Sequence, residues 1–197
     1  MFMYNIIQFV IYKNIIMILL FIRHCRTDYN INNLWCGLSD IDISASSKDD
    51  VPNLIEQIKI YDIDKIYCSP LKRAKETVEL LNKNINIAVD IEPLIIERSF
   101  GLLEGKQCTA KDKDDLANWI ANTDLNANVE KIQDMYFKRI KKFFDKLTKD
   151  PKNENKTFLI VAHSWVYRLL LFYLSNETKP ELIKNAPKPS YLYKFEI

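Results

Sequence analysis

Two short apolar runs constrain the fold of this chain most, because each one ends beside one of its only two histidines. Residues 17–22 (MILLFI) precede Arg23 and His24, and residues 157–162 (TFLIVA) precede His163. Continuous apolar runs of this length are typical of parallel strands that are buried on both faces. Ligands of open α/β sheets bind beyond the carboxyl ends of such strands. We therefore expect His24 and His163 to meet at one edge of a sheet.

Short apolar segments alternate with amphipathic ones along the rest of the chain. Strands are also expected at 64–68 and 93–96, and residues 191–197 (YLYKFEI) are expected to form an edge strand. This alternation predicts an α/β fold, in a three-layer α/β/α arrangement with a mainly parallel central sheet.

Two helices are predicted from apolar residues at helical spacing. One covers about 70–81, where Ser69 is a suitable N-cap and Pro70 fits the first helical position. The other runs from about Glu130 to Thr148, and most of its lysines lie away from its apolar face.

The composition of the 197 residues excludes several classes of protein. Hydrophobic residues make up 48% and charged residues 27%, so the chain is neither disordered nor fibrous. The 28 Lys and Arg nearly balance the 26 Asp and Glu, which argues against a nucleic-acid partner. Four cysteines form no CxxC, and with two histidines they cannot assemble a zinc site of standard spacing. Because no such zinc site can be assembled, we expect no metal. A chain of this size needs no disulfides, so we expect a reducing, cytoplasmic location.

The apolar N-terminal stretch, residues 1–22, has only a superficial likeness to a membrane anchor. Lys13 and Asn14 lie in its middle, and a central lysine costs about 2.5–3.5 kcal/mol on insertion. No basic region precedes the apolar run and no small-residue cleavage site follows it, which argues against a signal peptide. We expect residues 1–16 to be an extension, residues 17–197 to form a single domain, and no contact with a membrane.

Glycine and arginine are scarce in this chain, as histidine is, and their positions are therefore informative. Three glycines and six arginines occur, against 22 lysines. An arginine at a strand end, taken singly, is more often a surface ion-pair partner than a ligand of substrate. The joint clustering of scarce residues near strand ends is harder to explain by packing. The clustered residues are Arg23, Arg26, Gly37, Arg73, Arg98, Gly101, Gly105 and Arg168.

The clustered residues suit phosphoryl transfer. A planar guanidinium can hold two phosphate oxygens, which a lysine ammonium cannot do. A neutral imidazole can attack phosphorus and form a phosphohistidine, and nearby guanidinium charges would keep it unprotonated. A carboxylic acid must then protonate the leaving alcohol, and Glu97 is the best-placed candidate. The absence of a carboxylate pair beside the histidines argues against a metal-dependent phosphatase.

Five sequence blocks in a fixed order resemble the histidine phosphatase superfamily, whose fold is that of phosphoglycerate mutase. The first block, residues 23–30 (RHCRTDYN), is similar to the RHGxTxxN signature of that family. The resemblance spans residues 17 to about 175, and five blocks in order are a specific signal. The other four blocks are 36–40 (CGLSD), 68–77 (CSPLKRAKET), 97–105 (ERSFGLLEG) and 161–164 (VAHS).

The resemblance implies a role for each matching residue. His24 is expected to be the phosphorylated nucleophile, Glu97 the proton donor, and His163 a further residue of the catalytic site. No cofactor and no metal are implied. The residues expected to bind the substrate are Arg23, Thr27, Asn30, Gly37, Arg73, Arg98 and Ser164, the last through its backbone N–H.

Three residues depart from the pattern of the family. Cys25 stands where glycine is usual, so the backbone there is expected to shift. Arg26 replaces the usual Gln or Glu and is expected to add positive charge near the pocket. Ser164 replaces a glycine, which is tolerable if its backbone torsion angles are ordinary. None of the three removes a catalytic group.

Two activities and one non-enzymatic role are compatible with these blocks. Dedicated phosphoglycerate mutases of the family carry a long insertion with paired arginines after the fourth block, whereas residues 106–128 are short and contain no arginine. We therefore expect a metal-independent phosphomonoester hydrolase that acts on a small phosphorylated metabolite. The alternatives are a cofactor-dependent mutase and a catalytically weak module that binds phospho-ligands. The substrate (a sugar phosphate, a phosphoglycerate or α-ribazole phosphate) and the assembly, including a homodimer, stay open.

Overall fold

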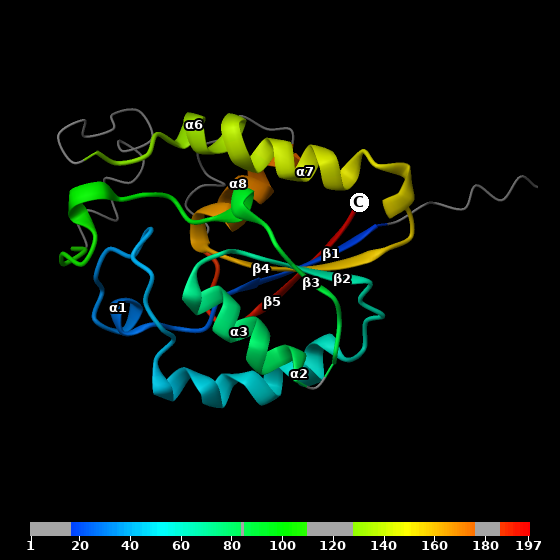
Figure 1. The fold of residues 1–197 in the computed structure, drawn as a ribbon, viewed down its shortest axis with the longest axis horizontal. Coiled ribbons are helices and arrows are strands. Elements are labelled where there is room, and N and C mark those ends of the chain that lie inside the picture. Colours follow the sequence, from blue (N-terminus) through cyan, green and yellow to red (C-terminus); the bar gives the residue numbers. More distant parts are fainter. Residues whose placement is uncertain (1–16, 84, 110–127, 176–185) are drawn as a thin grey trace, which may run out of the picture.

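The central sheet is formed by segments from both ends and the middle of the chain. The computed structural model describes residues 17–83, 85–109, 128–175 and 186–197. The strands in these residues are β1 (Ile18–Arg23), β2 (Lys65–Cys68), β3 (Val89–Ile91), β4 (Thr157–Ala162) and β5 (Leu192–Glu196). Their order across the sheet is β3-β2-β4-β1-β5 (Figure 1). The first four strands are parallel, and β5 pairs antiparallel with β1, so the predicted edge strand is confirmed.

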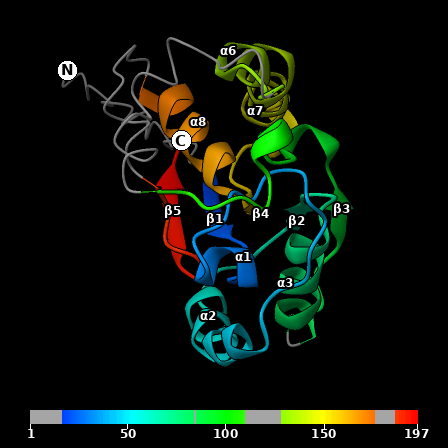
Figure 2. The same ribbon diagram turned by 90° about the vertical axis from the view of Figure 1, so that its left-hand side faces the viewer.

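Helices cover both faces of this sheet, which confirms the predicted α/β/α arrangement (Figures 1 and 2). One face carries α2 (Val51–Ile58) and α3 (Lys72–Asn82), and the other carries α6 (Ile132–Met135), α7 (Lys141–Thr148) and α8 (Ser164–Ser175). The shorter elements are α1 (Asp28–Ile31), the 3-10 segments Ala45–Asp50, Pro93–Ile95, Gly101–Leu103 and Pro151–Asn153, and a π-helical turn at Tyr136–Ile140.

The two apolar runs are central strands with side chains in both cores. Along β1, Leu19 and Phe21 pack beneath α7 and α8, whereas Leu20 and Ile22 pack beneath α2 and α3. This alternation follows from the two-residue period of a strand. All six residues of β4 are buried. The interpretation of both runs as buried parallel strands is confirmed.

The strand predicted at 93–96 is wrong. The next parallel strand is β3, and Pro93–Ile95 forms a 3-10 turn. Pro93 has no N–H to donate to a neighbouring strand, and the carboxylate of Glu92 accepts from the N–H of Leu94 at 2.9 Å and so caps the turn. All three residues of β3 are exposed, so this edge strand lacks the apolar contrast that marks β1 and β4.

Both predicted helices are present, but their ends differ from the prediction. The N-cap position of α3 is Leu71 and no side chain caps the helix, so the prediction of Ser69 as N-cap is wrong. The longer helix is unbroken from Ile132 to Thr148, through the π-helical turn.

No helix in the described part of the chain is both long and apolar enough to span a membrane. The expected extension, residues 1–16, lies outside the described residues.

Candidate active site

The carboxyl ends of three neighbouring strands bring the two histidines together with a serine. His24 follows β1, His163 follows β4 and Ser69 follows β2. The ring centroids of the two histidines lie 5.1 Å apart, at the edge of the sheet where their positions in the sequence predict them. Both rings are buried, and Ser69 is fully buried beside them.

The hydrogen bonds of His24 leave one ring nitrogen as an acceptor. Nδ1 lies 2.7 Å from the carbonyl oxygen of Cys25, and Nε2 accepts from Nε of Arg73 at 3.1 Å. Because a carbonyl oxygen can only accept, Nδ1 carries the proton and the lone pair lies on Nε2. Burial first, and then the charges of Arg73 and Arg23, hold the pKa of His24 well below its ordinary value of 6.5. His24 is therefore neutral near pH 7 and has a nucleophilic Nε2.

Neutral acceptors hold the guanidinium of Arg73, which lies in the first turn of α3. Besides Nε2 of His24, the carbonyl oxygen of Ser39 accepts from Nη1 at 2.9 Å and that of Gly37 accepts from Nη2 at 2.8 Å. The side chain is fully buried, and none of these acceptors is a carboxylate. Because its charge is not neutralised by them, this guanidinium is suited to an anionic ligand.

Glu104 fixes the loop that supplies these two carbonyl groups. Its carboxylate accepts from the N–H of Leu38 at 2.8 Å, from the N–H of Phe100 at 3.1 Å, and from the N–H and hydroxyl of Ser39 at 2.6 Å each. Burial alone would raise the pKa of Glu104, but these hydrogen bonds outweigh burial and lower the pKa. A Cβ at Gly37 would lie 2.4 Å from this carboxylate and 2.9 Å from the nitrogen of Phe100, so only glycine fits there.

Glu97 lies beside these groups, on the segment that follows β3. The side chain is buried, and its Oε1 accepts from the N–H of Arg98 at 2.9 Å and of Trp165 at 3.3 Å. Burial raises the pKa of Glu97, although those hydrogen bonds and the charges of Arg73 and Arg23 act in the opposite direction. The carboxyl group is therefore shifted toward the protonated form that a general acid requires.

The ring of His163 is held by a residue that the sequence assigned to another role. Oγ of Ser69 lies 2.6 Å from Nε2 of His163, and Nδ1 of this ring is buried without a hydrogen-bond partner in the described residues. Burial, and then the charge of Arg73, lowers the pKa of His163 well below 6.5. The sequence did contain a signal for Ser69, because it follows β2 directly, as the two histidines follow β1 and β4.

Arg23 is the last residue of β1, and Thr27 and Asn30 lie on the chain that follows it. Nη1 of Arg23 donates to the carbonyl oxygen of Pro187 at 3.0 Å, and burial is the main cause that lowers the pKa of Arg23. Thr27 caps α1, since its Oγ1 accepts from the N–H of Asn30 at 3.3 Å and Oδ1 of Asn30 accepts from the N–H of Thr27 at 3.1 Å. This reciprocal cap gives Thr27 a structural role and leaves the amide nitrogen of Asn30 for a ligand.

The three departures from the family pattern fit ordinary backbone geometry. Neither Cys25 nor Ser164 has a positive φ, and the N–H of Cys25 donates to Oγ1 of Thr77 at 3.0 Å. Arg26 is 47% exposed and lies 3.6 Å from Asp50. Contrary to the expectation, the charge of Arg26 therefore faces solvent and an acidic partner instead of the pocket.

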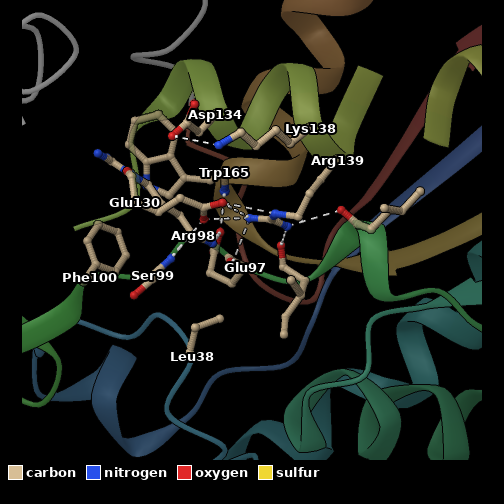
Figure 3. A network of polar contacts seen from close by, with 12 residues as sticks. Leu38, Glu97, Arg98, Ser99, Phe100, Glu130, Asp134, Lys138, Arg139 and Trp165 are labelled. Carbon is tan, nitrogen blue, oxygen red and sulfur yellow. Dashed lines mark hydrogen bonds and ion pairs between the residues drawn. The ribbon is translucent and has the colours of Figure 1, made fainter. Parts of the chain in front are cut away.

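Arg139, which lies outside the five blocks, holds the segment that carries Glu97 (Figure 3). It forms a two-point ion pair with Glu130, in which Nη2 lies 2.7 Å from Oε2 and Nε lies 3.1 Å from Oε1. Its Nη1 donates to the carbonyl oxygens of Leu94 at 3.2 Å and Ile96 at 2.7 Å. The donors of the Arg139 guanidinium are therefore used by partners within the protein, and these contacts order the segment that carries Glu97.

Arg98 lies beside this network with its guanidinium among aromatic rings (Figure 3). Nε donates to the carbonyl oxygen of Glu130 at 2.8 Å, and the guanidinium carbon lies 4.8 Å from the ring centre of Trp165 and 5.6 Å from that of Phe100. Burial lowers the pKa of Arg98 to about 10. In the described residues the guanidinium of Arg98 has no hydrogen bond to His24 or to the Glu97 carboxylate, so the role of Arg98 in substrate binding stays a prediction.

The arrangement can perform phosphoryl transfer with its own side chains. It combines a neutral nucleophile, a buried acid and guanidinium groups that suit a phosphate. In the residues that the structure describes, no three histidine, cysteine, aspartate or glutamate side chains lie together as a possible metal site.

Known proteins place the chain in one family. The family model of the histidine phosphatase superfamily (branch 1) matches residues 19–195. The uncharacterized phosphatase PhoE of Bacillus subtilis strain 168 is 29% identical over 161 residues, 82% of this chain and 78% of that protein. Phosphoserine phosphatase 1 of Hydrogenobacter thermophilus is 27% identical over 152 residues, 74% of this chain and 70% of that protein. A crystal structure of a putative alpha-ribazole-5'-P phosphatase from Escherichia coli K-12 shares the fold, with a TM-score of 0.75 and 24% identity over 90% of this chain and 89% of that chain. The chain therefore belongs to the histidine phosphatase superfamily.

Proposed function

We propose that this protein hydrolyses small phosphomonoesters through a phosphohistidine on His24, without a metal ion. The contact between His24 and Arg73 carries the proposal. A neutral imidazole with its lone pair on Nε2 lies 3.1 Å from Nε of a buried guanidinium, whose other acceptors are backbone carbonyls. A phosphate that binds this guanidinium comes within reach of the nucleophile.

In the first half-reaction, Nε2 of His24 attacks phosphorus and the ester P–O bond breaks. Arg73 donates to the phosphoryl oxygens in place of His24, and its charge stabilises the negative charge that they carry. Protonated Glu97 gives its proton to the departing alkoxide, which leaves as a neutral alcohol. The hydrogen bond from Nδ1 of His24 to the carbonyl of Cys25 stabilises the positive charge of the phosphorylated ring.

In the second half-reaction, water attacks the phosphohistidine. The Glu97 carboxylate takes a proton from the attacking water, the N–P bond breaks, and the electron pair returns to Nε2 of His24. Inorganic phosphate leaves, and the site returns to a neutral histidine and a protonated acid. The net reaction is hydrolysis of one ester bond.

The proposed phosphate pocket also includes Arg23, Asn30, His163 and the backbone N–H of Ser164. Ser164 is the first residue of α8, a helix of 12 residues, where backbone N–H groups and the helix dipole favour an anion. The ring centroid of His163 lies 5.1 Å from that of His24. The charge of half-buried Arg23 adds to burial and to the charge of Arg73 in lowering the pKa of both histidines. These observations support the same assignment.

Hydrolysis is favoured over the alternatives by two observations. Residues 106–128 contain no arginine that could hold the carboxylate of a phosphoglycerate, as the cap of a dedicated mutase does. Relatives over most of the chain bear phosphatase names. A module that only binds phospho-ligands would need the arginines, but it would need neither a neutral His24 nor a buried acid at Glu97.

A panel of phosphomonoesters tests the proposal with the full chain in EDTA, and it includes phosphoserine, α-ribazole phosphate, sugar phosphates and phosphoglycerates. We expect phosphate release from at least one ester, unchanged by EDTA and abolished by His24→Ala. Interconversion of 3- and 2-phosphoglycerate with little phosphate release would favour the mutase. Loss of turnover in EDTA would contradict metal independence, and binding without turnover would favour the binding module.

We further propose a cytoplasmic homodimer whose functional domain is residues 17–197. The four cysteines are all free thiols, which is compatible with a reducing compartment. Light scattering of the full chain tests the dimer, and cell fractionation tests the location. A chain that begins at Met17 is expected to keep its activity, and an inactive or insoluble product would contradict the assignment of residues 1–16 as an extension.

A further inference from the structure

Ser69 contacts the catalytic-site histidine His163, and the proposed mechanism gives this serine no role. Its Oγ lies 2.6 Å from Nε2 of His163, and the N–H of Leu71 donates to the same oxygen at 3.4 Å. Ser69 and His163 are both 0% exposed, so bulk water is not a partner for either side chain. The protons of this pair must therefore be shared between the two residues and a bound ligand.

The count of donors and acceptors distinguishes the two neutral forms of His163. If Nε2 carried the proton, it would donate to Ser69. The serine proton would then need another buried acceptor, although in the described residues Oγ contacts only the His163 ring and the Leu71 N–H. The lone pair on Nδ1 would also lack a donor. This form leaves two groups without partners.

The other neutral form leaves only one group without a partner. If the hydroxyl of Ser69 donates to Nε2 of His163, the serine proton and the ring lone pair satisfy each other. The ring proton then lies on Nδ1, which is the buried atom without a hydrogen-bond partner in the described residues. An N–H at that position is a donor that awaits an acceptor, and a phosphate dianion offers only acceptors.

We propose that Ser69 is a positioning residue that holds His163 in the tautomer with its proton on Nδ1, so that this N–H donates to a phosphoryl oxygen of the substrate. The tautomer matters because His163 has only one ring proton. Burial and the charge of Arg73 hold the pKa of His163 well below 6.5, so a doubly protonated ring is not the resting state. The identity of the ligand rests on the proposed function, whereas the tautomer is a property of the protein without ligand.

Nitrogen-15 NMR of the imidazole rings tests this proposal on the full chain near neutral pH. Only two histidines contribute, and His24→Asn assigns the signals of His163. In the wild-type protein we expect Nε2 of His163 to be unprotonated and Nδ1 to be protonated. In Ser69→Ala we expect a mixed or reversed pattern and a kcat/KM that is lower by about 10- to 100-fold, because a buried hydrogen-bonding group loses its partner. Ser69→Thr keeps the hydroxyl and should restore the wild-type pattern.

Ser47→Ala is the matched control, because Ser47 is also fully buried but its hydroxyl contacts the carbonyl oxygens of Ser44 at 2.8 Å and Arg26 at 3.0 Å. It should change neither the tautomer nor kcat/KM. A wild-type His163 with its proton on Nε2 overturns the proposal, even if Ser69→Ala does not fold. Loss of activity in Ser69→Ala with an unchanged tautomer overturns it as well. If no phosphomonoester is hydrolysed by the wild type, the proposed function fails, and the NMR result still decides this proposal.

Discussion

Arg73 and Arg139 are both largely buried, but different groups face their charges. Arg139 meets the carboxylate of Glu130 at two points (Figure 3). Arg73 meets two backbone carbonyls and a neutral histidine. A guanidinium that is paired with a carboxylate is already neutralised and orders the segments around it. A guanidinium that is held by neutral acceptors keeps its charge for a ligand, and the partners of a buried arginine therefore separate structural from functional positions.

The same contrast separates two buried or half-buried carboxyl groups. Glu130 is paired with Arg139. In the part of the chain that the structure describes, Glu97 instead accepts only from the backbone N–H groups of Arg98 and Trp165, and burial raises its pKa. The carboxyl group of Glu97 is thus hydrogen-bonded by backbone groups instead of an arginine, and it can hold the proton that it must transfer to the substrate. In the neighbouring network, the charges of Glu130 and Arg139 neutralise each other.

Arg73→Lys should have the largest effect. A lysine ammonium cannot contact His24, Ser39 and Gly37 at once or hold two phosphoryl oxygens, so we expect kcat/KM to fall by about 10²- to 10³-fold. Steady-state kinetics measure the loss, and circular dichroism checks that the fold is intact. A variant with nearly wild-type kinetics would remove the distinction between Arg73 and Arg139.

Glu97→Gln should have the next largest effect, and the effect should depend on the leaving group. The amide keeps the shape and the acceptor oxygen but has no proton to transfer, so kcat/KM, which reports the steps up to release of the alcohol, should fall by about 10²-fold or more for an alkyl phosphate. The loss should be much smaller for p-nitrophenyl phosphate, whose leaving group needs no proton. Equal losses for the two substrates would show that Glu97 is not the general acid.

The pH dependence of kcat/KM should have two limbs with assigned causes. Because the pKa of Glu97 is raised, the acid stays protonated above its usual range, and activity should fall at higher pH as Glu97 loses its proton. Because the pKa of His24 is lowered well below 6.5, activity should fall only at acid pH, where Nε2 becomes protonated. Each limb should approach a tenfold change per pH unit. The alkaline limb should be absent in Glu97→Gln, and its persistence would assign it to another group.

Arg139→Lys should have the smallest effect on catalysis and a measurable effect on stability. Lysine keeps the charge but loses the two-point pair with Glu130, so we expect the free energy of unfolding to fall by about 1–2 kcal/mol. A change in kcat/KM of no more than about threefold should accompany it, because Arg139 contacts Glu97 at its backbone carbonyl oxygen and not at its carboxyl group. Denaturant unfolding and kinetics on the same sample test both parts. A loss as large as that of Arg73→Lys would give Arg139 a direct role in the chemistry.

The sequence predicted those strands in which a continuous run of apolar residues differs clearly from the polar residues around it. The apolar runs of β1 and β4 identify two central strands, because both faces of each strand are buried. β3 is short and exposed, and the apolar residues around Pro93 form a turn, so the same rule failed there. Ser69 satisfied a local rule for helix caps, but its contact with His163 depends on how β2 and β4 pair, which no local rule contains.

The candidate site was predictable to the extent that its scarce residues follow strands. The meeting of His24 and His163 follows from their positions after β1 and β4. The partners of Arg73 did not follow, because they lie on a loop whose path is set by Glu104, far along the chain. The ion pair of Arg139 was equally hidden, because both Arg139 and its partner Glu130 lie outside the five sequence blocks.

Trapping of the intermediate tests the central claim most directly. The full chain is mixed with a phosphomonoester that carries radiolabelled phosphate and is quenched in alkali during turnover, and the label is then located by peptide mapping. We predict alkali-stable, acid-labile phosphate on His24, none on His24→Ala, and transfer of this label to water as inorganic phosphate. Turnover with no label on His24, or label that persists in His24→Ala, would contradict the account.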